Sequence, residues 1–107
     1  MRKSLLLAVL LIFSSLAFAA KSYNLTFNSP TKVAGVELRS GTYSVRIAGD
    51  KAIFKDEHSN ETTVPVKLEN GARKFDYTSV ESLAKDGKDT VKMIHLAGST
   101  TTLEFGD

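Results

Sequence analysis

Apolar and polar residues alternate almost without interruption over residues 36–56, VELRSGTYSVRIAGDKAIFKD. Because successive side chains of a β-strand point to opposite faces, this period of two predicts strands with one buried and one solvated face. Two dipeptides typical of tight turns, Ser40-Gly41 and Gly49-Asp50, divide the stretch into three strand segments. We expect the inward side chains of these segments to form the centre of the core: Val36, Leu38, Tyr43, Val45, Ile47, Ala52 and Phe54.

Similar alternation recurs along most of the chain beyond residue 22. It predicts strands near residues 23–27, 64–68, 92–96 and 101–105, the last two forming a hairpin, and a polar loop at 55–61. Pro65 has no N–H to donate, which places its strand at a sheet edge or makes this position of the backbone face solvent. Asn70-Gly71 predicts a type I′ turn, after which Phe75 and Tyr77 begin another strand. About seven short strands predict an all-β fold, either a small antiparallel β-sandwich or an open barrel.

Residues 78–87 are compatible with two structures. Thr78-Ser79-Val80-Glu81 matches a helical capping box, and Gly87 is placed to end a short helix over residues 79–86. Alternatively, a strand runs through Val80 and turns at Asp86-Gly87. A helix of two turns is marginal without tertiary support, so the surrounding strands favour the second structure.

The first twenty residues, MRKSLLLAVLLIFSSLAFAA, have the three parts of a signal peptide. Arg2 and Lys3 form a charged start, the stretch 5–13 is apolar, and Ala17-Phe18-Ala19 supplies small residues at the cleavage site. The apolar stretch is shorter than the roughly 20 residues that a membrane-spanning helix needs. We therefore expect a signal peptide over 1–20 and a single β domain over 21–107, located in the periplasm or outside the cell and not spanning a membrane once processed.

Composition narrows the range of partners. The chain has 14 basic and 12 acidic residues, and since Arg2 and Lys3 belong to the leader, 12 of each remain. A neutral domain without runs of one charge argues against nucleic-acid binding. About a third of the residues from 21 onwards are apolar, and no cysteine is present to add a disulfide. With such a thin core, either the hairpins pack unusually well, or a partner or a second copy of the chain adds burial.

Two groups of residues carry a resemblance. The first is Val33-Ala34-Gly35 with Leu38, Gly41 and Tyr43, and the second is Ile94-His95-Leu96-Ala97-Gly98-Ser99. Together they resemble a group of small exported bacterial single-domain β proteins of uncharacterised function, in which V-G-x-x-x-L-x-x-G-x-Y and I-x-L-G-G-T are usual. This chain differs in the position of its first glycine and in having Ala97 and Ser99. The resemblance implies a β fold and export, and it implies no activity.

Motifs that would indicate catalysis or a bound cofactor are missing from the sequence. It contains no Gly-x-Ser-x-Gly, no His-Glu-x-x-His, no phosphate-binding loop and no cysteine nucleophile. Asp56-Glu57-His58, with Glu61 close behind, is the one run that resembles metal ligands, but no second His or Cys set accompanies it. We expect no enzyme, no cofactor and no metal, and a solvated loop at residues 55–61.

The function we expect is therefore non-enzymatic binding of an envelope or extracellular partner, protein or glycan, or self-association. The contact surface would be a strand edge or the strand face that carries Met93 and His95. That face lies opposite Ile94 and Leu96, and the period of two adds Val91 to it. Outward residues of the opening stretch are further candidates: Glu37, Arg39, Ser44 and Arg46. The alternative is a carrier of small hydrophobic molecules with a cavity like that of calycin barrels.

Overall fold

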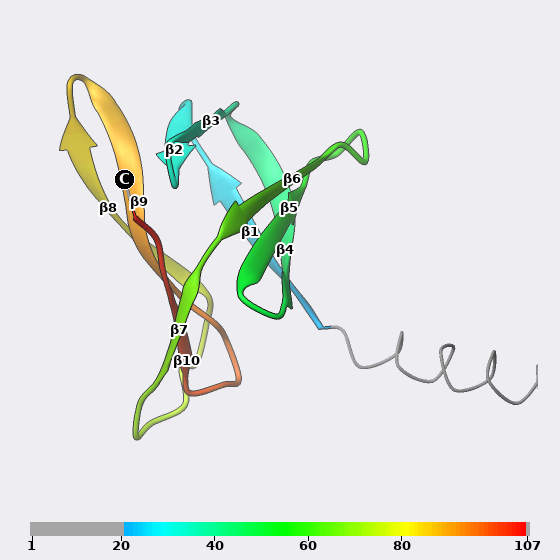
Figure 1. Cartoon of the computed structure of the whole chain (residues 1–107), viewed down its shortest axis with the longest axis vertical. Coiled ribbons are helices and arrows are strands. Elements are labelled where there is room, and N and C mark those ends of the chain that lie inside the picture. The colour runs from blue at the N-terminus through cyan, green and yellow to red at the C-terminus, as the bar shows by residue number, and fades with distance from the viewer. Residues whose placement is uncertain (1–20, 107) are drawn as a thin grey trace, which may run out of the picture.

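The computed structural model describes residues 21–106, and the expected signal peptide lies outside them (Figure 1). The described residues form an all-β fold of two sheets, as predicted, with more and shorter strands than the seven expected. Ten strands are present: β1 (Ser22–Phe27), β2 (Thr31–Val33), β3 (Val36–Leu38), β4 (Gly41–Ala48), β5 (Lys51–Lys55), β6 (Glu61–Pro65), β7 (Lys67–Asn70), β8 (Ser79–Lys85), β9 (Lys88–His95) and β10 (Thr101–Glu104).

The first sheet has four antiparallel strands in the order β1-β4-β5-β6. Gly49 and Asp50 connect β4 to β5, and Gly49 has a φ of 63°, as the first central position of a type II′ hairpin turn requires. Pro65 ends β6, the edge strand of this sheet, which confirms the prediction from its missing N–H. Residues adjacent in sequence thus account for most of this sheet.

The second sheet is built around β9 and has six strands. β8 pairs with β9 along one side, while β2 and β10 pair with successive parts of its other side (Figure 1). The β2–β9 pair is parallel, an exception to the expected antiparallel pattern. β3 extends the sheet beyond β2, and β7 extends it beyond β10. Two of these pairs, β2–β9 and β7–β10, join strands from distant parts of the sequence.

The two sheets share one core, which identifies the fold as a sandwich. The chain passes from one sheet to the other at Val66, between β6 and β7, and Val66 is buried together with Val64 of β6, whereas the four residues of β7 are exposed. Tyr43, predicted to be a core residue, is buried and its hydroxyl donates to the Arg39 carbonyl at 2.7 Å. The buried apolar residues are Leu25, Phe27, Val33, Leu38, Tyr43, Val45, Ala52, Phe54, Val64, Val66, Val91, Ile94, Leu96, Leu103 and Phe105.

Two local predictions in this part of the fold were wrong. Val36 is 40% exposed rather than buried, because β3 is a three-residue edge strand that buries only Leu38. Asn70-Gly71 is not a type I′ turn: neither residue has a positive φ, and the Gly71 N–H donates to the Thr100 carbonyl at 2.8 Å. β7 pairs with the distant β10, which takes the place of the expected hairpin partner.

The region after Asn70 also differs from the prediction of a strand beginning at Phe75 and Tyr77. Phe75 forms a single bridge to Ala97, and Tyr77 is 72% exposed. The strand begins at Ser79, and residues 79–85 are β8, so the strand is confirmed over the short helix. Its hairpin to β9 turns at Asp86-Gly87, both with positive φ.

An irregularity in β9 changes which face Val91 occupies. Glu81 and Ser82 are neighbours on β8, yet they pair with Met93 and Val91, so Lys92 is an extra residue on β9. Such a bulge shifts the alternation by one position. Val91 is consequently fully buried on the side of Ile94, and its predicted place beside Met93 and His95 was wrong. Among residues 21–106, no helix is long and apolar enough to cross a membrane.

Candidate functional site

β8 offers a free strand edge. It pairs with β9 on one side and with no other strand of the described chain. A free edge exposes unpaired backbone N–H and C=O groups, which form a template for another strand. The other edge strands of the two sheets are β1, β3, β6 and β7, and each is shorter than the seven residues of β8. β6 is further protected by Pro65, whereas β8 contains no proline.

Large apolar side chains lie exposed at both ends of this edge. Leu83, within β8, is 60% exposed, and Tyr77, two residues before β8, is 72% exposed. The outer half of the β8–β9 hairpin projects away from the four-stranded sheet (Figure 1). Leu83 is an exposed residue of the part of β8 nearer to the hairpin turn.

A hydrogen-bonded cluster around His95 ties β8 to its sheet. The cluster consists of Glu81 of β8, His95 of β9, Thr102 of β10 and Phe75, which lies in the loop between β7 and β8. The Glu81 carboxylate lies 2.5 Å from His95 Nε2, and the Thr102 hydroxyl lies 2.8 Å from His95 Nδ1. The Phe75 ring packs on the imidazole with ring centroids 4.7 Å apart. Loop residues thus partly cover the face on which we predicted a contact surface.

The chemistry of the His95 cluster is that of a brace between strands. Since a carboxylate only accepts hydrogen bonds, His95 Nε2 donates to Glu81. The Thr102 hydroxyl either donates to or accepts from Nδ1, so the cluster accommodates the neutral and the protonated imidazole. The acid–imidazole–hydroxyl order is that of a hydrolase triad, in which both ring nitrogens likewise have partners, and here the three side chains connect the neighbouring strands β8, β9 and β10.

Two carboxyl groups meet on the same sheet. A hydrogen bond between Glu69 of β7 and Glu104 of β10 raises the pKa of Glu104, with burial and repulsion between the two charges adding to the effect. Lys67, which faces Glu104 across the strands, opposes this rise. This sheet surface therefore holds a proton more readily than an isolated glutamate does.

A polar cleft lies between the β3–β4 connection and the β5–β6 loop. It has a volume of about 330 Å³, and its lining includes Arg39, Tyr43, Glu57 and His58. Within residues 21–106, no group of three or more His, Cys, Asp or Glu side chains is arranged to hold a metal ion. The run Asp56-Glu57-His58 thus contributes to the wall of a solvent-filled cleft.

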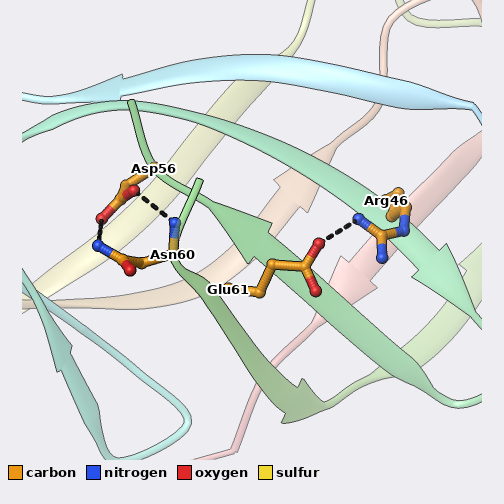
Figure 2. Close-up of polar contacts among 4 residues, drawn as sticks. All are labelled: Arg46, Asp56, Asn60 and Glu61. Carbon is orange, nitrogen blue, oxygen red and sulfur yellow. Dashed lines mark hydrogen bonds and ion pairs between the residues drawn. The ribbon is translucent and has the colours of Figure 1, made fainter. Parts of the chain in front are cut away.

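Asp56 organises the loop beside this cleft. Its carboxylate accepts a hydrogen bond from the backbone N–H of His58 at 2.8 Å. It also accepts hydrogen bonds from the backbone N–H and the side chain of Asn60, at 2.9 and 3.2 Å (Figure 2). The backbone hydrogen bond from Asn60 is the main reason why the pKa of Asp56 is lowered. The carboxylate that resembled a metal ligand in the sequence therefore holds the loop in shape.

The six predicted contact residues do not form one surface. Ser44 and Arg46 alternate with buried residues on β4 of the four-stranded sheet, whereas Met93 and His95 belong to β9 of the other sheet. Arg46 pairs with Glu61 at 3.1 Å (Figure 2). The remaining two predicted residues lie near the β3–β4 connection: Glu37, which pairs with Lys88 at 2.5 Å, and Arg39, which lines the polar cleft.

Sequence reasoning missed the importance of Glu81, Leu83 and Phe75. The helix and strand alternatives for residues 79–86 left it open whether Leu83 faces a core or solvent. Regular pairing counted back from the predicted Asp86-Gly87 turn would set Glu81 opposite Lys92, and only the bulge at Lys92 moves Glu81 opposite Met93, onto the face that carries His95. The position of Phe75 over His95 depends on a loop whose path the local sequence does not define.

A comparison of the chain with protein-family models, with curated proteins and with solved structures found no match.

Proposed function

We propose that this protein is an exported, non-enzymatic β module that binds an extended segment of a protein partner along the free edge of β8. The observation that carries the proposal is a seven-residue edge strand, without proline, that displays the exposed side chain of Leu83. Strand addition of this kind draws its affinity from main-chain hydrogen bonds and its specificity from alternate side chains.

A protein partner suits this edge better than a glycan. The unpaired N–H and C=O groups of a strand recur at the spacing of another polypeptide backbone. Exposed apolar side chains next to them favour a partner segment that alternates apolar and polar residues. The His95 cluster supports the same function, because its bonds from β9 to Glu81 hold β8 in a fixed position for pairing.

Carriage of small hydrophobic molecules is the alternative that the sequence suggested. It would require an apolar cavity, whereas the clefts around the described residues include polar lining such as Arg39 and Glu57 in one, and Lys32 and Asp86 in another. We therefore favour the binding module. Displacement of an apolar dye by fatty acids would support the carrier instead.

The test identifies a partner and then locates its contact. Envelope proteins retained by the immobilised protein are purified and titrated one at a time, and amide hydrogen exchange is followed in the complex. We expect protection concentrated in residues 79–85. Leu83→Lys should weaken binding at least about tenfold, since it places a charge where an apolar contact forms.

Val36→Lys is the matched control, because Val36 is also an exposed apolar residue on an edge strand, β3. It should bind as the unmodified protein does. Protection of another element, together with unchanged binding by Leu83→Lys, would overturn the proposal.

A further inference from the structure

The pattern of side chains along β8 is complementary to itself, and we infer that the segment which pairs with the β8 edge is β8 of a second copy of this chain. This inference rests on the proposed function and names the partner. The two β8 strands would pair antiparallel, related by a two-fold axis that passes between the two copies of Leu83. The two six-stranded sheets would then continue into one another.

The first step is the face on which the side chains lie. Glu81 reaches His95, and the alternation of β8 puts Leu83 and Lys85 on the same face as Glu81. Val80 and Ser82 lie on the other face, since Val80 packs against the core and both line a cleft near Thr26 of β1. The outward row of β8 therefore reads Glu81, Leu83, Lys85 towards the hairpin turn.

The second step is the register. When a strand pairs antiparallel with its own copy, the two-fold axis must pass between the two copies of one residue, which then face each other. In any other register, inward side chains would oppose outward ones. An axis through Leu83 sets the two leucines side by side and places each Glu81 opposite Lys85 of the second copy. Opposite charges and apolar pairs facing each other across strands are stabilising.

Neighbouring registers are less favourable. An axis through Glu81 opposes two like charges, and an axis through Ser82 sets Glu81 opposite Leu83 of the second copy. An axis through Ala84 sets Leu83 opposite Lys85. Only the Leu83 register pairs opposite charges with each other and sets the two exposed leucines side by side, so the sequence of β8 favours this register.

The third step is access. The Leu83 register uses residues 81–85, the five residues of β8 nearest the hairpin turn, and the outer part of this hairpin projects beyond the four-stranded sheet (Figure 1). Glu81 can keep its bond to His95 in the dimer, because a carboxylate has two oxygens and one of them, Oε2, makes that bond. A contact of five residues on each strand is small, so the association should be weak and depend on protein concentration.

Disulfide trapping tests the register directly, since the chain has no cysteine of its own. Facing residues of paired strands have Cα atoms about 4.5–5.5 Å apart, within the range that a disulfide spans. Leu83→Cys alone should give a covalent dimer under mild oxidation. Glu81→Cys and Lys85→Cys should each stay monomeric alone and cross-link when mixed.

Sedimentation equilibrium supplies the second measurement. The mass of the unmodified protein should rise towards twice the monomer mass with concentration. Glu81→Lys should reduce the association, and the double variant Glu81→Lys with Lys85→Glu should restore it. A dimer that needs the His95 bond rather than the charge pair would not be restored, which separates the two explanations.

A monomer at every concentration, combined with no Leu83→Cys dimer, would overturn the self-association. Cross-linking of Glu81→Cys with itself would overturn the register. If the protein were strictly monomeric but a different purified partner protected residues 79–85 from exchange, the proposed function would stand and only its partner would change. If no dimer formed and no partner protected residues 79–85, both the self-association and the proposed function would be overturned.

Discussion

The two sheets of this molecule form their hydrogen bonds in different ways. In the four-stranded sheet, β4, β5 and β6 follow one another in sequence, and the acids near them meet donors, as Glu61 meets Arg46. In the six-stranded sheet, β9 joins strands from both ends of the described chain, and its surface sets Glu69 against Glu104. The first sheet is specified mainly by pairing between strands that follow one another, with β1 and β6 at its edges. The second sheet has the longest edge strand, β8, and a pair of carboxyl groups that repel each other when both are ionised.

The largest difference between the two regions should appear when an apolar side chain is shortened. Phe54, on β5, is fully buried, and its ring lies 6.5 Å from that of Tyr43 and 6.0 Å from that of Phe105. Phe54→Ala should lower the free energy of unfolding by about 3–5 kcal/mol, because it removes buried area and leaves a cavity. Urea denaturation of the monomer measures it.

Leu83→Ala in the same experiment is the control, and it should change the stability of the monomer by less than about 0.5 kcal/mol, as exposed substitutions usually do. Similar losses for both variants would mean that the β8 edge is part of the folding core and not a free surface.

The next contrast concerns the two hairpin turns. Gly49, between β4 and β5, has a φ of 63°, and Gly87, between β8 and β9, has a φ of 77°, with open space around both positions. An alanine at either site is strained by roughly 1–2 kcal/mol because its Cβ crowds the backbone. We expect Gly49→Ala to lower the global stability by that amount.

Gly87→Ala should act more locally, because β8 packs mainly against β9 and can open without the rest of the fold. Amide exchange should therefore speed up in residues 79–90, with a smaller change in the denaturation midpoint. Equal global losses from the two alanines would show that the β8–β9 hairpin unfolds only with the whole domain.

The same division explains how much of the fold the sequence predicts. The period of two and the Gly49-Asp50 turn correctly predict β4 and β5, because a hairpin between adjacent segments depends on local information. The type I′ turn predicted at Asn70-Gly71 was wrong for the opposite reason, because the pairing of β7 with the distant β10 overrides the local turn propensity. Val91 misled because a bulge, which adds one residue without a clear sequence signal, reverses the faces of β9.

Predictions about the surface were limited by the same physics. Outward side chains such as Arg46 and His95 are identifiable from alternation, but the sequence does not say which sheet each one reaches. The pairing of Glu81 with His95 requires the register of β8 on β9, and the exposure of Leu83 requires that β8 be an edge strand. Both depend on contacts between strands, which periodicity alone does not encode.

A pH titration contrasts the acids of the two regions. Hydrogen bonds lower the pKa of Asp56, so its contribution to stability is present above the ordinary pKa of aspartate, near 4, and is lost as the pH falls through the lowered value. Asp56→Ala should be less stable at neutral pH and should lack this part of the acid loss. Thermal unfolding between pH 2 and 7 measures both effects.

Asp76→Ala, which removes one acid from the loop before β8, is the matched charge control. A parallel pH profile for Asp56→Ala and the unmodified protein would show that the loop does not depend on this carboxylate.

The smallest effect on stability should come from Glu104, and its dependence on pH should be opposite in sign to that of Asp56. Its pKa is raised by Glu69, so the stabilising contribution of its proton is fully present below the ordinary glutamate pKa and is lost as the pH rises through the raised value. Glu104→Gln keeps a hydrogen-bond donor beside Glu69 and removes the repulsion between two carboxylates. We expect a slightly more stable protein at neutral pH, with no loss of stability on raising the pH through that window.

Glu69→Gln should give the same profile, and the two substitutions together should add little to either alone, because each relieves the same repulsion. Full additivity in the double variant would show that the two carboxyl groups do not interact, and the six-stranded sheet would then carry no more charge strain than its four-stranded neighbour.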